Sequence, residues 1–129
     1  MTKEFVPYEL ALKLKELGFD EPCFVLYKAS NNNQLAYAPH GITTNSQLSQ
    51  GDSNNIAAPL FQQAFRWFRE KYHIIGEPKY KGGLTTKTSW YDYIIYSNID
   101  WKEDNKQYKT YEEAELACLD KLIDLNLLQ

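Results

Sequence analysis

The chain has 129 residues, of which 43% are hydrophobic and 15% aromatic, and its formal net charge is −3 at pH 7. This length and apolar content favour one globular domain over residues 1–129, because such a chain can bury a core without metal or disulfide support. The slight acidic excess excludes a global field that draws the protein to nucleic acid or to an anionic membrane. Binding of either kind would need a local basic patch.

Cysteine usage and hydropathy bear on the compartment. Cys23 and Cys118 are far apart in sequence and form no Cys-x-x-Cys pair. No basic and then apolar leader precedes Phe5, and the longest apolar runs are too short to span a bilayer. We therefore expect a cytoplasmic protein without a membrane partner, in which both thiols are reduced, buried and unreactive.

The first third of the chain predicts a helix, a hairpin and a loop. Leucines at helical spacing indicate a helix over 8–17, and Gly18 is typical of a left-handed cap. The apolar runs 23–27 and 34–38 enclose a turn and predict a hairpin. The polar stretch 40–55 is typical of a long surface loop.

The most apolar helix is expected within the stretch 55–75. Phe61, Phe65 and Phe68 recur at helical spacing, which predicts a buried aromatic stripe. Pro59 suits a first helical turn, and Gly76 prevents continuation at the other end. We expect this helix to be structural.

The last third predicts strands at 74–81 and 90–97, an edge strand within 99–108, and a final helix. That helix begins at Thr110, which forms a capping box with Glu113. The expected fold class is α+β, with a mostly antiparallel sheet of four or five strands and three helices packed mainly on one face.

A search for chemistry gives negative results. Gly82-Gly83 lacks the lysine and the following helix of a phosphate-binding loop, and the chain contains no Gly-x-Ser-x-Gly sequence. His40 and His73 have no second histidine or cysteine at ligand spacing. We therefore predict no catalytic residue, no metal site and no cofactor.

The order helix, three strands, helix over residues 59–127 matches the topology of a double-stranded-RNA-binding domain. Such domains hold phosphates with basic residues at the start of the final helix, where this chain has Tyr111-Glu-Glu-Ala-Glu115. Nucleic-acid binding is therefore an alternative to the main prediction.

Several segments resemble a group of short uncharacterised proteins from gut Bacteroidetes genomes and their prophages. They cover about a third of the chain and lie at 5–11, 15–23, 57–72 and 110–114. The group has no activity or site residues to transfer. The resemblance implies a bacterial cytoplasm and a prophage or mobile-element context.

Together these observations favour a small accessory or protein-interaction module, since tyrosine and tryptophan are enriched at interfaces. An enzyme of unrecognised type is the second alternative, after nucleic-acid binding. The predicted binding residues lie on the ribbon from Lys79 to Tyr93: Lys79, Lys81, Lys87, Trp90, Tyr91 and Tyr93. The bland interpretation is that these lysines keep a sheet edge soluble while the aromatic rings pack under the helices. Neither the partner protein nor the oligomeric state follows from the sequence.

Overall fold

The computed structural model describes residues 2–51, 54–82 and 89–127. The chain forms two compact units, Met1–Ala64 and Phe65–Gln129, and the division falls within helix α3 (Phe61–Tyr72). Each unit has its own sheet and is described here by itself. The expectation of one domain over residues 1–129 stays a prediction.

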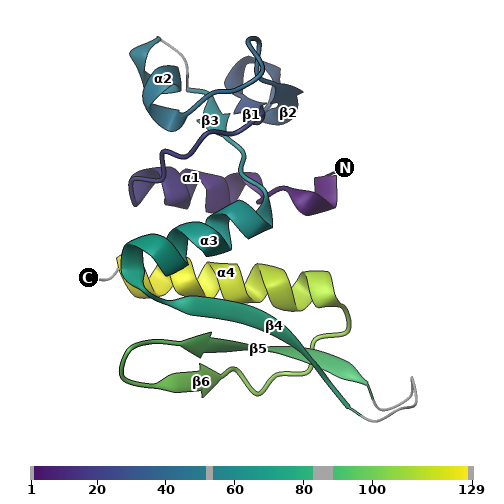
Figure 1. The fold of residues 1–129 in the computed structure, drawn as a ribbon. Helices are drawn as coiled ribbons and strands as arrows, with labels where there is room; N and C mark the ends of the chain where they lie inside the picture. The colour runs from purple at the N-terminus through teal and green to yellow at the C-terminus, as the bar shows by residue number, and fades with distance from the viewer. Residues whose placement is uncertain (1, 52–53, 83–88, 128–129) are drawn as a thin grey trace. The chain divides into compact units, whose positions relative to one another are not determined.

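The first unit contains a three-stranded antiparallel sheet in the order β2-β1-β3 (Figure 1). Helices α1 and α2 both contact β3. The predicted first helix and hairpin are confirmed, and Gly18 has the expected positive φ of 98°. The elements are the 3-10 helix η1 (Thr2–Glu4), α1 (Tyr8–Glu16), β1 (Val25–Lys28), the 3-10 helix η2 (Ala29–Asn31), β2 (Gln34–Tyr37), α2 (Asn45–Gln50) and β3 (Ile56–Ala57).

The prediction of an uninterrupted loop over 40–55 is wrong, because α2 lies within it. Thr44 and Gln47 form a capping box, in which each side chain accepts a hydrogen bond from the other residue's backbone N–H. The buried Asn45 amide then donates to the Phe19 carbonyl and accepts from the Ala57 N–H. This side chain ties the short helix to the sheet.

Helix α3 begins at Phe61, close to Pro59, which the sequence places in the first helical turn. Residues 56–57 pair with β1 as β3. Pro59 disfavours a helical conformation of the residue before it, which keeps the preceding segment extended. The burial of the aromatic stripe is confirmed, since Phe61, Phe65 and Phe68 are 7%, 7% and 0% exposed.

The second unit contains the end of α3, a three-stranded antiparallel sheet in the order β4-β5-β6, and helix α4. Helix α4 lies along one face of this sheet and contacts β4 and β5 (Figure 1). The predicted strands are confirmed, although β6 is shorter than the expected edge strand. The elements after α3 are β4 (Ile75–Lys81), β5 (Trp90–Tyr96), β6 (Trp101–Glu103) and α4 (Tyr111–Leu127).

The α+β class and the antiparallel pairing are confirmed, but one sheet of four or five strands with three helices is wrong. The described residues form two three-stranded sheets and four α-helices. The start of α4 lies where predicted: the Thr110 hydroxyl accepts from the Glu113 N–H at 3.1 Å. The Glu113 carboxylate accepts from Lys109 rather than from the capping residue. Within the described part of the chain, no helix has the length and apolar character needed to cross a membrane.

Candidate interaction face of the second sheet

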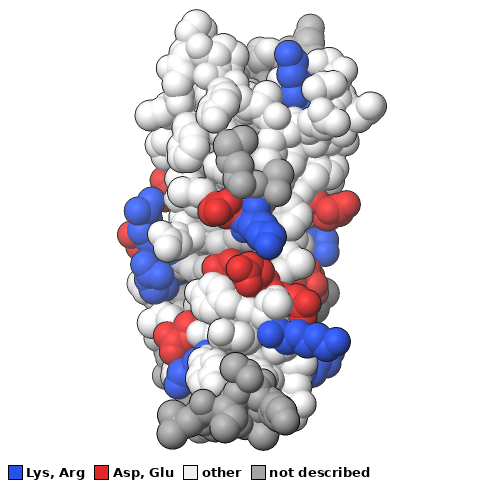
Figure 2. Space-filling model, turned by 90° about the vertical axis from the view of Figure 1, so that its right-hand side faces the viewer, with Lys and Arg blue, Asp and Glu red and all other residues white. Residues whose placement is uncertain are grey.

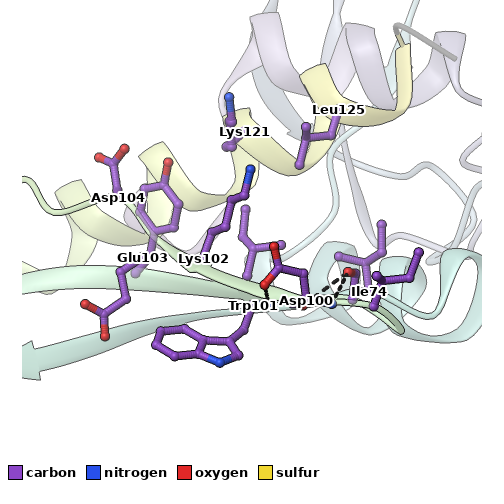
Figure 3. Close-up of a pocket in the computed structure, with 12 residues that line it drawn as sticks. Ile74, Asp100, Trp101, Lys102, Glu103, Asp104, Lys121 and Leu125 are labelled. Atoms are coloured by element: carbon purple, nitrogen blue, oxygen red, sulfur yellow. Dashed lines mark hydrogen bonds between the residues drawn. The ribbon is translucent and has the colours of Figure 1, made fainter.

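Gly76 identifies the face of the second sheet that α4 covers. A Cβ atom at this position would lie 2.8 Å from Cys118 Sγ and 2.8 Å from Leu122 Cδ1, both on α4. Cross-strand partners share a face, and Gly76 pairs with Ile95, which pairs with Lys102. These residues define the α4 face, and the opposite side is here named the outer face. In Figure 3, Lys102 accordingly points toward α4 whereas Trp101 and Glu103 point away from it.

The outer face carries a continuous apolar row across all three strands. Ile75 pairs with Tyr96, and Tyr96 pairs with Trp101, so the three side chains lie side by side. Trp101 is 60% exposed and Ile75 is 42% exposed, while Tyr96 is half-buried. This apolar row, Ile75–Tyr96–Trp101, offers large contact area to a binding partner.

Two carboxylates stand next to the apolar row. Glu77 pairs with Ile94, and Ile94 pairs with Glu103, so both acids flank the buried Ile94 on the outer face. Glu103 forms an ion pair with Lys81. The hydrogen bond to Glu103 raises the pKa of Lys81, and the nearby negative charges act in the same direction. The positive charge of Lys81 is therefore balanced by the carboxylates of Glu103 and Asp92.

Asp92 is a buried carboxylate on the outer face, 1% exposed. Its Oδ2 accepts from the Asn105 N–H at 3.0 Å and lies 3.8 Å from Lys81 Nζ. Asn105 has a φ of 65°, and the chain returns to β5 only at Tyr108, which exchanges two 2.8 Å backbone hydrogen bonds with Tyr91. Asp92 thus supplies the acceptor for a bulge after β6. Its Oδ1 has no hydrogen-bond partner among the described residues.

The six predicted binding residues divide between the two faces of the sheet. Lys79, Lys81 and Trp90 lie on the outer face, because they alternate with residues that face α4. Lys79 is exposed, and Trp90 is half-buried. Lys87 lies outside the described residues.

Tyr91 and Tyr93 lie on the α4 face. The Tyr91 ring contacts Tyr80 at 5.6 Å and Tyr111 at 6.1 Å between ring centroids. Tyr93 is 6% exposed, which assigns its ring to the core. Binding by the six residues stays a prediction, but only those on the outer face lie beside the apolar row.

Sequence reasoning did not select Ile75, Tyr96 and Trp101 as a group. The alternation of side chains along the predicted strand 90–97 puts Tyr96 on the same side as Trp90, and Trp101 lies in the predicted edge strand. The missing information was the register, which alone brings residues from three strands into one row.

Several titratable groups have raised pKa values, because removal from solvent disfavours their charged forms. The Tyr108 hydroxyl donates to Asp104 Oδ2 at 2.6 Å, and burial, followed by this contact, raises the pKa of Tyr108. Burial likewise raises the pKa of the Cys118 thiol, and in the first unit it raises that of Cys23 to about 12. Both cysteines are free and buried, as predicted. Neither thiol is activated as a nucleophile by its surroundings.

Charge is mixed rather than segregated on the side of the molecule drawn in Figure 2. Figure 2 shows basic and acidic side chains interspersed on the side that it draws. Among the residues that the structure describes, no three His, Cys, Asp or Glu side chains gather into a group that could hold a metal ion.

Comparison of the chain with protein-family models, with curated proteins and with solved structures gives no match.

Proposed function

We propose that this protein is an accessory or protein-interaction module of a bacterial cytoplasm, and that the outer face of the second sheet binds its partner protein. The exposure of Trp101 within the apolar row is the observation that carries the proposal. Tryptophan and tyrosine supply large contact area at little cost in conformational entropy, and they dominate the energetics of many interfaces. The resemblance to Bacteroidetes and prophage proteins supports the bacterial and mobile-element context.

The charges of the outer face favour a protein over a nucleic acid as the partner. Among the described residues, the lysines on this face are Lys79 and Lys81, and the acids are Glu77, Asp92 and Glu103. Lys81 already pairs with two of these carboxylates. Phosphates would meet net negative charge, whereas an apolar segment of a protein would bury the row without an electrostatic penalty.

Affinity capture from a host lysate, with mass spectrometry of the captured proteins, tests the proposal. Trp101→Ala should weaken capture of the partner by about thirtyfold, the loss typical of an interface hot spot. Ile42→Ala is the matched control, because Ile42 is 62% exposed and lies in the first unit. Equal capture by the wild type and both folded variants would contradict a role for the apolar row.

Nucleic-acid binding is the second candidate function, and the element order α3-β4-β5-β6-α4 is the observation that favours it. The order matches that of double-stranded-RNA-binding domains. Glu112 and Glu113 in the first turn of α4 oppose phosphate binding there. Titration of a duplex RNA at several salt concentrations separates the candidates: affinity that falls steeply with salt and weakens in Lys79→Ala would favour the nucleic acid.

A further inference from the structure

The described strands leave four sheet edges, two in each sheet, and three of these edges are blocked against a further strand. In β3, the Ala57 N–H that faces away from β1 donates to the Asn45 side chain at 3.0 Å. In β6, the Trp101 N–H donates to the Asp100 carboxylate at 2.7 Å. The middle residue of β4 is Pro78, which has no N–H. Such features keep an edge strand from pairing with another chain.

The fourth edge belongs to β2 (Figure 1). The Ala38 N–H donates to the Phe24 carbonyl at 2.9 Å, so residues 34, 36 and 38 bond toward β1 under antiparallel alternation. Leu35 lies between them and therefore directs its N–H and C=O away from β1. Within the described part of the chain, no residue outside the sheet bonds to either group. The middle of this edge is therefore open.

The side chains of β2 also lack the usual protection of an edge. The segment 29–39 contains no charged residue, and β2 itself contains no proline. Leu35 and Tyr37 lie on one face of the strand, because side chains alternate along it. Leu35 is half-buried, whereas Tyr37 is 68% exposed. The edge thus presents apolar side chains beside an open backbone.

We propose that β2 pairs with β2 of a second copy of this chain, antiparallel and about a two-fold axis at Ala36. In this register Leu35 of each copy lies opposite Tyr37 of the other copy, and the Leu35 N–H and C=O become part of a continuous sheet. Leu35 also packs against the exposed Tyr37 ring across the new strand pair. The small side chains of the two Ala36 residues meet at the axis.

The properties of the strand favour a second copy as the occupant. A two-fold pair requires a self-complementary edge, and β2 meets this requirement, since the same contact between Leu35 and Tyr37 forms twice. Two copies place no like charges opposite each other, because the segment 29–39 is uncharged. The combined sheet has the order β3-β1-β2-β2-β1-β3. Association stops at the dimer, because the contact from Asn45 blocks each β3 edge.

Sedimentation equilibrium of the purified protein over a wide range of concentrations tests the proposal. We expect a reversible equilibrium between monomer and dimer. Leu35→Pro should weaken dimerisation by about thirtyfold, because the two-fold axis makes each dimer lose two hydrogen bonds. The bonds from β2 to β1 remain, since the Leu35 N–H faces away from β1, and circular dichroism checks that the variant is folded. Ile42→Ala is the control: Ile42 is 62% exposed in the same unit, and this variant should dimerise as the wild type does.

Ala36→Cys gives a second test that does not depend on proline. The two Ala36 residues form a pair without mutual hydrogen bonds, whose Cα atoms lie about 4.5 Å apart, a separation that a disulfide can bridge. Mild oxidation should therefore link two copies of Ala36→Cys much faster than two copies of Ile42→Cys. The native cysteines are buried and do not compete.

Three results would each overturn the proposal. The first is a wild type that stays monomeric at every concentration, which would leave the edge to a strand of another protein. The second is equal dimerisation of the wild type and the folded Leu35→Pro variant. The third is cross-linking of Ala36→Cys no faster than that of Ile42→Cys.

Discussion

The two faces of the second sheet are built from the same strands, but only one of them packs against α4. On the α4 face, Gly76 allows the helix to approach and Tyr93 is buried beneath it. On the outer face, Trp101 stands 60% exposed beside Ile75 and Tyr96. Both faces are aromatic, so hydrophobicity does not distinguish them. Gly76 distinguishes them, because a strand residue without a side chain allows the helix to approach the backbone closely.

The largest effect should come from the α4 side of this contact. Leu122 is fully buried, and Leu122→Ala should lower the free energy of unfolding by about 2–5 kcal/mol through lost burial and the cavity left behind. Leu116→Ala is the control on the same helix, because Leu116 is 39% exposed and its truncation should cost no more than about 0.5 kcal/mol. Urea denaturation measures both. Equal losses would contradict the division of α4 into a packed and an exposed side.

Gly76→Ala sharpens the same comparison from the sheet. The added methyl would meet Cys118 and Leu122 at 2.8 Å, and such overpacking should cost about 1–3 kcal/mol. Gly51→Ala is the control, since the nearest atom to its added methyl is the Leu48 carbonyl oxygen at 3.9 Å. Thermal melts should show a lower midpoint for the first variant only. An unchanged midpoint in Gly76→Ala would mean that α4 does not rest on this residue.

The outer face also contains the buried carboxylate of Asp92, and substitution of this residue tests its role in the bulge after β6. Asp92→Ala removes the acceptor of the Asn105 N–H and should cost about 1–3 kcal/mol. Asp92→Asn keeps an acceptor oxygen and loses only the attraction to Lys81, so its loss should be smaller. Chemical denaturation of the two variants gives the order. A larger loss in Asp92→Asn than in Asp92→Ala would show that the carboxylate does not hold the bulge by accepting this hydrogen bond.

The sequence predicts those parts of the fold that depend on local patterns, and it does not predict those that depend on contacts between distant segments. Local patterns located the helix at Tyr8, the hairpin, β5 and the start of α4 at Thr110. The division into two sheets depends on strand pairing, and no local pattern reports which strands pair. The capping box at Thr44 was a local signal that the polar composition of 40–55 obscured.

The candidate site shows the same limit. Alternation assigned Trp90 and Tyr93 to opposite sides of β5, but it did not tell which side a helix covers. That choice depends on contact between Gly76 and a helix more than forty residues later in the sequence. A glycine within a strand is the sequence signal that marks such close approach.

A smaller and gradual effect is expected at alkaline pH. Burial, together with a nearby glutamate, raises the pKa of Cys23 from 9.0 and of Tyr27 from 10.0 to about 12 each. Their neutral forms therefore stabilise the fold fully below the unfolded pKa values, and this contribution is lost as the pH rises through about 9 to 12. Melts between pH 8 and 11 should show falling stability, with a shallower fall in Cys23→Ala. A rise in stability over this pH range would contradict the raised pKa values of Cys23 and Tyr27.

Acrylamide quenching of single-tryptophan variants tests the exposure of the outer face most directly, with the buried Trp67 of α3 as the reference. One variant keeps Trp101 by Trp67→Phe and Trp90→Phe, and the other keeps Trp67, which is 7% exposed, by Trp90→Phe and Trp101→Phe. The account predicts that Trp101 is quenched several times more efficiently than Trp67 in the folded protein. Equal quenching of the two, or weaker quenching of Trp101, would mean that the outer face is covered and would contradict its proposed role as a binding surface.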